Sequence, residues 1–160
     1  MLATDIDESE KPEEAPQALA ARLAAAKAAA AAALRPQGII LAADTVVACG
    51  RRILPKAETV EQARACLTLL SGRRHRVYGG IVVQKPGAKP LRRTVMTVVR
   101  FKRLTKAEIE GYLASGEWQG KAGGYAIQGR AAAFIAGING SYTNVVGLCV
   151  HTVAKLLTGF

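Results

Sequence analysis

An apolar run with a single acid at its centre constrains this chain more than any other feature. The segment Gly38-Ile-Ile-Leu-Ala-Ala-Asp-Thr-Val-Val-Ala-Cys49 predicts a buried β-strand, and Asp44 within it is the only aspartate after Asp7. An ionised carboxylate in such a strand is costly unless it is paired or binds a metal. Because so costly a group more often serves chemistry than folding, Asp44 is the first candidate for a functional residue.

Helices and strands alternate along the rest of the chain. Alanine-rich residues 17–34 predict a helix, and the capping boxes Thr59-Val-Glu-Gln62 and Thr105-Lys-Ala-Glu108 predict the starts of two more. The remaining predicted elements are strands at 77–83 and 94–101 around a turn at 85–90, a strand at 132–138, a loop at 139–144 and a helix at 147–157. This alternation is typical of an α/β domain.

Composition excludes several classes of protein. No apolar stretch is long enough to cross a bilayer, and the amino terminus lacks the basic region of a signal peptide. Three widely spaced cysteines and two histidines indicate reduced thiols and argue against a zinc site. We therefore expect a cytoplasmic protein without a membrane partner.

The charge of the chain is distributed unevenly. Six of the twelve acids lie within residues 5–14, whereas from residue 15 onward 21 lysines and arginines face six acids. A body this basic attracts polyanions such as nucleic acid, anionic lipid or nucleotide phosphates. Only 5% of the residues are aromatic and no nucleic-acid-binding module is visible, so small phosphorylated ligands are the favoured partners and nucleic acid is not expected.

The dipeptide Asp44-Thr45 and two lysines suit phosphate chemistry. A carboxylate beside a hydroxyl provides the oxygen ligands that Mg²⁺ or Mn²⁺ prefers. Lys56 follows Asp44 across a predicted hairpin turn that returns it to the same edge of the sheet, where an ammonium group would neutralise phosphate charge. Lys27 is the one charge within the last three turns of the alanine-rich helix. The alternative is a structural ion pair around Asp44, with the lysines as ordinary surface charges.

A glycine-rich stretch is the second candidate region. Gly120-Lys-Ala-Gly-Gly-Tyr-Ala-Ile-Gln-Gly129 is neither a P-loop nor a dinucleotide-binding fingerprint, but such a backbone approaches a ligand closely and presents N–H donors. Gln128 offers a donor and an acceptor, which reading the edge of a base requires. The alternative is a structured turn with a glutamine that is merely satisfied.

Taken together, these motifs resemble one family. The chain is similar to the Maf nucleotide pyrophosphatases through segments that occur in that family's order and spacing: Ala43-Asp-Thr-Val-Val47, Ile53-Leu-Pro-Lys56, Leu70-Ser-Gly72 with His75-Arg-Val77, residues 121–129 and Gly140-Ser-Tyr-Thr-Asn-Val-Val-Gly-Leu148. The resemblance implies a Maf/ITPase-like α/β fold, with two lobes about a cleft and a mixed, twisted sheet flanked by helices. It also implies hydrolysis of a nucleoside triphosphate to the monophosphate and pyrophosphate with Mg²⁺ or Mn²⁺, in a cytoplasmic protein that is often a homodimer.

The resemblance also assigns roles to individual residues. Asp44 would be the catalytic acid, as proton acceptor or as metal ligand, and Glu8 would be a second carboxylate near the metal. Lys27 and Lys56 would face the phosphates as further catalytic residues. Thr45 and Gln128 match positions that separate substrate branches, and here they are similar to the branch that prefers dTTP and UTP. The family is thought to clear unwanted nucleotides, with a link to cell-division arrest.

One departure from the family bears on activity. The family usually opens with a strand that leads into a Ser/Pro/Arg-Arg loop that grips the triphosphate, whereas this sequence begins after that point. We therefore expect residues 1–160 to form a single Maf-like domain that is truncated at its amino terminus relative to the family. Two hypotheses follow: a nucleotide pyrophosphatase, or a remnant of the fold that binds nucleotides or nucleic acid with little or no turnover.

Overall fold

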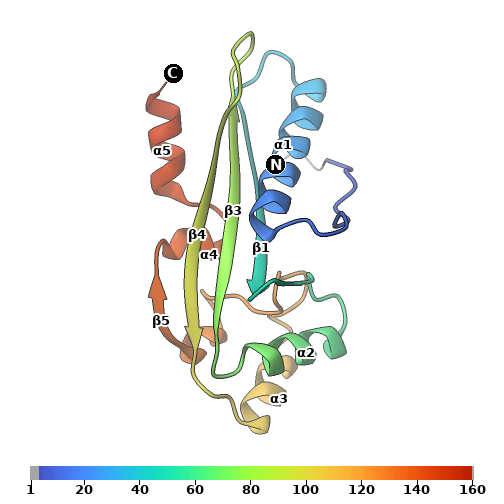
Figure 1. Ribbon diagram of the computed structural model, residues 1–160, viewed down its shortest axis with the longest axis vertical. Helices are drawn as coiled ribbons and strands as arrows, with labels where there is room; N and C mark the ends of the chain where they lie inside the picture. Colours follow the sequence, from blue (N-terminus) through green and yellow to red (C-terminus); the bar gives the residue numbers. More distant parts are fainter. Residues whose placement is uncertain (1–3, 160) are drawn as a thin grey trace.

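The computed structural model describes residues 4–159, arranged around a five-stranded sheet of order β2-β1-β3-β4-β5 (Figure 1). The strands are β1 (Ile40–Cys49), β2 (Arg52–Leu54), β3 (Arg74–Gln84), β4 (Leu91–Phe101) and β5 (Ile135–Asn139). The helices are α1 (Pro16–Leu34), α2 (Val60–Leu70), α3 (Lys106–Ala114), α4 (Tyr142–Val146) and α5 (Val150–Thr158), with a 3₁₀ turn η1 (Arg130–Phe134) before β5. The α/β class and the helices that flank the sheet are as predicted.

The sheet differs from the expected mixed sheet in one respect, because every pair of neighbouring strands described here is antiparallel. Tight turns join β1 to β2 and β3 to β4, and a hairpin makes its strands antiparallel by construction. The connection through α2 brings β3 back in the same direction as β2, on the other side of β1, so β3 is also antiparallel to β1. The connection through α3 reverses the chain between β4 and β5.

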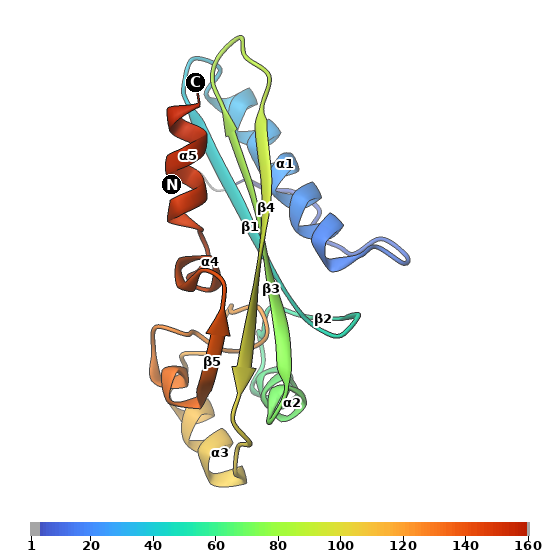
Figure 2. The ribbon, with the colours of Figure 1, turned by 60° about the vertical axis from the view of Figure 1, so that its left-hand side comes forward.

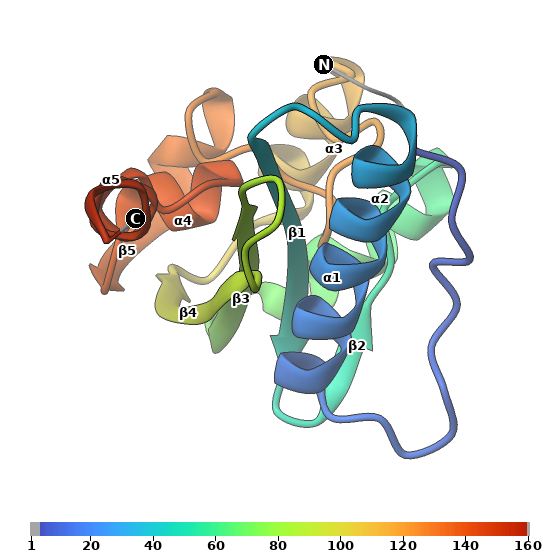
Figure 3. The same ribbon diagram turned by 90° about the horizontal axis from the view of Figure 1, so that it is seen from above.

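Helix α1 covers one face of the upper part of the sheet, and α5 covers the other (Figures 2 and 3). The face toward α1 is formed by Ile40, Ala42 and Val82, which pack against an alanine stripe on the helix: Ala24, Ala28 and Ala31. At Gly80 of β3, a Cβ atom would lie 2.1 Å from the backbone oxygen of Ala20. The small residues therefore allow the helix backbone to lie directly on the sheet.

The lower part of the molecule contains the largest core cluster. Helices α2 and α3 pack there against the sheet around Leu67, Phe101 and Trp118 (Figure 1).

In the upper part of the sheet, on the face opposite α1, Ile81 and Val83 pack against Val153 and Leu156 of α5. Long strands run through both parts, which gives the two-lobed arrangement that the resemblance implied. Within residues 4–159 no helix has the length and apolar character needed to span a bilayer.

Two predicted boundaries near the carboxyl terminus are wrong. The predicted strand at 132–138 begins as the 3₁₀ turn η1 and becomes a strand only at Ile135. The predicted loop at 139–144 contains the start of α4, because Ser141 caps Tyr142–Val146 through its hydroxyl, which accepts a hydrogen bond from the Asn144 backbone N–H at 3.2 Å. The last helix, α5, is separate from α4 and begins at Val150.

Candidate active site

Asp44 lies on the face of β1 that α1 covers. Side chains two residues apart on a strand share a face, so Asp44 points the same way as Ala42 and Val46, both of which pack under α1. It is 5% exposed, and its carboxylate forms an ion pair with Lys27. Lys27 follows Ala24 by three residues on the helix, and it therefore projects from the same side as the buried alanine stripe.

Glu8 extends this ion pair into a network. Its carboxylate oxygens lie 2.8 Å from the Lys27 ammonium and 2.5 Å from the Lys56 ammonium. Hydrogen bonds from Lys27 and then Lys56 lower the pKa of Glu8. Burial on its own lowers the pKa of Lys27, but hydrogen bonds and charges from its two acidic partners outweigh burial and raise it. Two lysines and two carboxylates thus form a chain with no net charge, linking α1, β1 and the segment after β2.

The site offers two carboxylates to a divalent cation. In residues 4–159 no three His, Cys, Asp or Glu side chains form a metal-binding group. Glu8 and Asp44 nevertheless converge on one point, which the Lys27 ammonium occupies. Mg²⁺ is commonly bound by one or two carboxylates, with substrate phosphates and water completing its shell. Two convergent carboxylates therefore fit such an ion when a phosphate ligand accompanies it.

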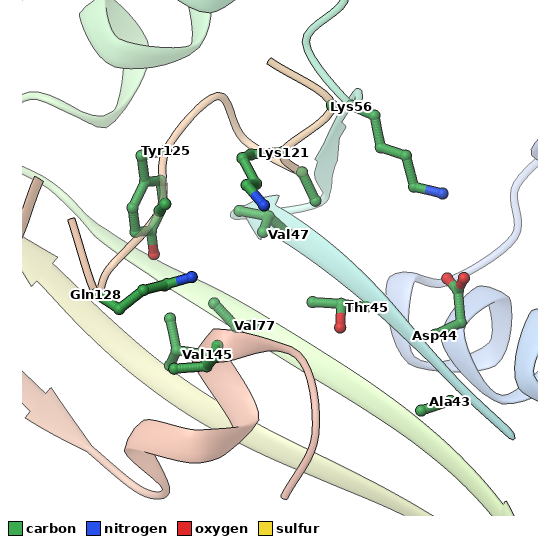
Figure 4. A pocket seen from close by; sticks show the side chains of 14 residues that line it. Ala43, Asp44, Thr45, Val47, Lys56, Val77, Lys121, Tyr125, Gln128 and Val145 are labelled. Atoms are coloured by element: carbon green, nitrogen blue, oxygen red, sulfur yellow. The ribbon is translucent and has the colours of Figure 1, made fainter. Parts of the chain in front are cut away.

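Two adjoining cavities meet at Asp44. The glycine-loop pocket, of about 220 Å³, is lined by residues that include Thr45, Val77, Lys121, Tyr125, Gln128 and Val145 (Figure 4). The carboxylate pocket, of about 320 Å³, is lined by residues that include Glu8, Ser9, Ile53 and Glu58. Asp44, Thr45, Lys56 and Ala122 line both cavities. Five of the six predicted site residues therefore line this bipartite cleft at the edge of β1, and the sixth, Lys27, contacts it through its ion pairs with Glu8 and Asp44.

Buried aromatic residues support the floor of the glycine-loop pocket. The Tyr125 hydroxyl lies 2.7 Å from Nε2 of His75, which is 1% exposed. Burial lowers the pKa of His75 to about 4, so the ring is neutral at pH 7. Phe101 packs edge-on against both rings, with ring centroids 5.1 Å from His75 and 4.9 Å from Tyr125. His75 therefore holds a pocket-lining tyrosine in place.

Asn144 anchors the opposite wall. Its side-chain amide is buried and donates to the Val77 carbonyl at 3.2 Å and to the Thr97 hydroxyl at 3.1 Å. Gly79 is required beside it, because a Cβ there would lie 2.1 Å from the amide oxygen of Asn144. These contacts fix α4 against β3 and β4, and α4 contributes Val145 and Val146 to the pocket.

The glycine-rich stretch reaches the cleft as a loop pinned to the segment that carries Lys56. The Ala57 N–H donates to the Lys121 carbonyl at 3.0 Å, and the Gly120 N–H donates to the Ala57 carbonyl at 2.8 Å. Gly123 has φ +72° and packs on Val47, which a Cβ would meet at 3.0 Å. Sequence reasoning took only Gln128 from this stretch and missed Lys121, although Lys121 is its only charged residue.

Comparison with known proteins identifies the family of this chain. The family model described as "Maf-like protein" matches residues 1–160. The chain belongs to the Maf family. One relative, the dTTP/UTP pyrophosphatase of Paramagnetospirillum magneticum, is 59% identical over 155 residues, which cover 97% of this chain and 82% of the relative.

Other Maf relatives bear the same name. The dTTP/UTP pyrophosphatase of Mesorhizobium japonicum is 55% identical over 165 residues, covering 99% of this chain and 79% of the relative. That of Maricaulis maris is 57% identical over 156 residues, covering 98% of this chain and 74% of the relative. The sequence-based assignment to the Maf family is therefore confirmed.

Proposed function

We propose that this Maf protein hydrolyses dTTP, UTP or related modified nucleotides to the monophosphate and pyrophosphate. The observation that carries the proposal is the bipartite cleft, in which Asp44 and Lys56 stand between a partly apolar pocket and a charged one. A nucleoside triphosphate has the same two halves, a flat base and a chain of phosphates. The names of the Maf relatives support the pyrimidine substrates.

The residues of the cleft suit attack by water on the α-phosphorus. Water adds to phosphorus, the bond to the bridging oxygen breaks, and pyrophosphate departs with that oxygen. The proton lost by water passes to a carboxylate oxygen of Asp44 and then to solvent. Lys27 and Lys56 stabilise the negative charge that gathers on the departing pyrophosphate. Buried at the base of the cleft, Asp44 is held in one orientation by β1 and α1.

We further propose that Glu8 and Asp44 hold a divalent cation together with the phosphates. Such an ion, when bound, neutralises phosphate charge and lowers the pKa of a water molecule. Lys27 occupies the point between the two carboxylates in this structure. Binding of a cation therefore requires the Lys27 ammonium to turn from the carboxylates toward the substrate phosphates, which its flexible stem allows.

Thr45 and Gln128 are proposed to select the base. Thr45 lines the pocket from β1, and its hydroxyl lies 3.5 Å from the Gly147 carbonyl, so it ties β1 to the end of α4. Gln128 enters the pocket from the loop before η1 (Figure 4). Its amide is complementary to the N3–H and carbonyl edge of uracil or thymine.

Pyrophosphate release tests the proposal. The wild-type protein and Asp44→Asn are compared with dTTP and UTP in Mg²⁺ and in Mn²⁺, and circular dichroism verifies that both are folded. We expect Asp44→Asn to lower kcat by at least about 100-fold, the usual loss when an acid–base group is removed. Glu61→Gln is the matched control, because Glu61 lies at the exposed start of α2, away from both pockets. Equal rates in wild type and Asp44→Asn would refute the role of Asp44.

A second candidate function is nucleotide binding without turnover. One observation favours it: both carboxylates of the cleft are already neutralised by lysines. It predicts that dTTP and UTP bind to the wild-type protein, with calorimetry giving a measurable Kd, while no pyrophosphate is released with any divalent cation. Turnover that depends on Asp44 would eliminate this candidate.

Three wider properties are part of the proposal. The three cysteines are free thiols, which supports a cytoplasmic location. Residues 1–160 are proposed to act as one Maf-like domain and to form a homodimer, which sedimentation would test. Removal of unwanted nucleotides is the proposed cellular role, and the connection with cell-division arrest stays a prediction.

A further inference from the structure

The Tyr125 hydroxyl is a buried polar group at the wall of the glycine-loop pocket. Tyr125 is 6% exposed and lines this pocket, and Figure 4 shows its hydroxyl turned toward the side chain of Gln128. Within residues 4–159 the only hydrogen-bond partner of the hydroxyl is Nε2 of His75, at 2.7 Å. Burial raises the pKa of Tyr125, so the hydroxyl keeps its proton at neutral pH. The direction of the hydrogen bond to His75 therefore decides where that proton points.

The second ring nitrogen of His75 sets this direction. Nδ1 is buried and has no hydrogen-bond partner in the part of the chain that the structure describes. Because burial lowers the pKa of His75 to about 4, the ring is neutral at pH 7 and only one of its two nitrogens carries a hydrogen. A hydrogen on Nδ1 would leave a buried N–H without an acceptor, and orphaned donors are rarer in proteins than under-satisfied acceptors. The hydrogen therefore belongs on Nε2, which donates it to the oxygen of Tyr125.

A hydroxyl that accepts the hydrogen bond from His75 has its own proton available for a ligand. Phe101 holds the Tyr125 ring by packing edge-on against it, with the two ring centroids 4.9 Å apart. The neighbouring backbone is also fixed, because the Ala126 N–H donates to the Tyr112 hydroxyl at 3.0 Å. A donor that is already held in one position loses little conformational entropy when a ligand binds. The pocket therefore offers a preorganised donor that has no acceptor among residues 4–159.

We propose that Tyr125 is a binding residue of the glycine-loop pocket, and that its hydroxyl, oriented by His75, donates a hydrogen bond to a ring carbonyl oxygen of a pyrimidine base. Uracil, thymine and cytosine all carry a carbonyl at position 2, so this contact holds the base without choosing among them. The inference rests on the proposed function, because it assumes that this pocket takes the base. The alternative is that the bond between Tyr125 and His75 serves the fold alone.

Calorimetry with the α,β-methylene analogue of UTP, which resists hydrolysis, measures binding apart from turnover. We expect Tyr125→Phe, which keeps the ring, to raise Kd about tenfold through the loss of one hydrogen bond. Tyr112→Phe is the matched control, because the Tyr112 hydroxyl supports the same loop through the Ala126 N–H but lines neither pocket. We expect this control to change Kd by less than about twofold, since no contact with the ligand is lost. Equal weakening in both variants, or none in Tyr125→Phe, would overturn the proposal.

Nitrogen-15 NMR of the wild-type protein tests the role of His75, because protonated and unprotonated ring nitrogens differ in chemical shift. We expect the hydrogen on Nε2, and a ring with its hydrogen on Nδ1 would overturn the proposal, since the Tyr125 hydroxyl would then donate to His75. Binding that depends on Tyr125, in a protein that releases no pyrophosphate, would refute the proposed catalysis and leave this inference intact. Turnover of UTP with an unchanged kcat/KM in Tyr125→Phe would do the reverse.

Discussion

Replacing Lys27 with methionine would leave Asp44 buried without a partner. Methionine preserves the unbranched stem and the helix propensity of lysine, so α1 is not otherwise disturbed. Asp44 is 5% exposed, and within residues 4–159 its side chain has no hydrogen-bond partner other than Lys27. Glu8, whose side chain is 38% exposed, also loses a partner but keeps Lys56 and contact with solvent.

The size of the effect follows from the burial of the ion pair between Lys27 and Asp44. Removing one member of a buried ion pair costs about 3–5 kcal/mol, because the remaining charge is left uncompensated. The side chain of Lys27 is 21% exposed, so we expect the lower end of this range, about 3 kcal/mol at pH 7.

Urea unfolding followed by circular dichroism measures the free energy of unfolding at pH 7. Lys27→Met with Asp44→Asn is the compensating double variant, and we expect it to recover most of the loss because no charge remains buried. Lys56→Met is the matched control, since its partner is Glu8 and both side chains are more than a third exposed. We expect that control to cost less than about 1 kcal/mol.

Either of two results would refute this account of Asp44. The first is a Lys27→Met variant no less stable than Lys56→Met, which would show that solvent or another group satisfies the carboxylate. The second is a double variant no more stable than Lys27→Met alone, which would assign the effect to packing of the methionine and not to charge.

Three further predictions concern the walls of the glycine-loop pocket. Burial lowers the pKa of His75 to about 4, whereas the imidazole of the unfolded chain keeps its ordinary pKa of about 6.5. As the pH drops from about 6.5 to about 4, protonation therefore favours the unfolded chain, and the free energy of unfolding should fall by about 3 kcal/mol. Urea titrations should show a weaker pH dependence in His75→Gln, and an unchanged one would contradict the prediction. Gly79→Ala places a Cβ 2.1 Å from the Asn144 amide oxygen and should lower the thermal midpoint by several degrees, whereas Gly111→Ala in α3, with open space around it, should raise it slightly. Gln128→Ala should lower kcat/KM for UTP about tenfold without changing the midpoint, and full activity would remove Gln128 from the base site.

Short-range sequence patterns predicted much of the fold. The capping boxes at Thr59 and Thr105 both form as predicted and start α2 and α3. The buried strand around Asp44 is β1, and the hairpin that returns Lys56 toward Asp44 is formed by β1 and β2. Such features depend on residues a few positions apart, which is why a single sequence reveals them.

The parts that were missed depend on contacts between distant segments. The start of β5 is delayed to Ile135 because Phe134 is buried in the lower core with η1, and no local pattern reports that packing. Glu8 pairs with Lys27 and also with Lys56, which lies 48 positions further along the chain than Glu8. No local pattern singles out Lys121, because only the bridge between Lys56 and Ala122 places its loop beside the Lys56 segment.

The alanine-rich helix connects packing to the chemistry of the cleft. In the sequence it indicated only a helix. In the structure the backbone of α1 rests on β3, where a Cβ at Gly80 would lie 2.1 Å from the Ala20 oxygen. Lys27 projects from that same surface to meet Asp44, so the reach of its ammonium is set by how closely the helix lies on the sheet. Side chains larger than alanine along this stripe would move α1 away from the sheet and separate Lys27 from Asp44. The alanine-rich sequence of α1 therefore allows the ion pair of the buried carboxylate to form.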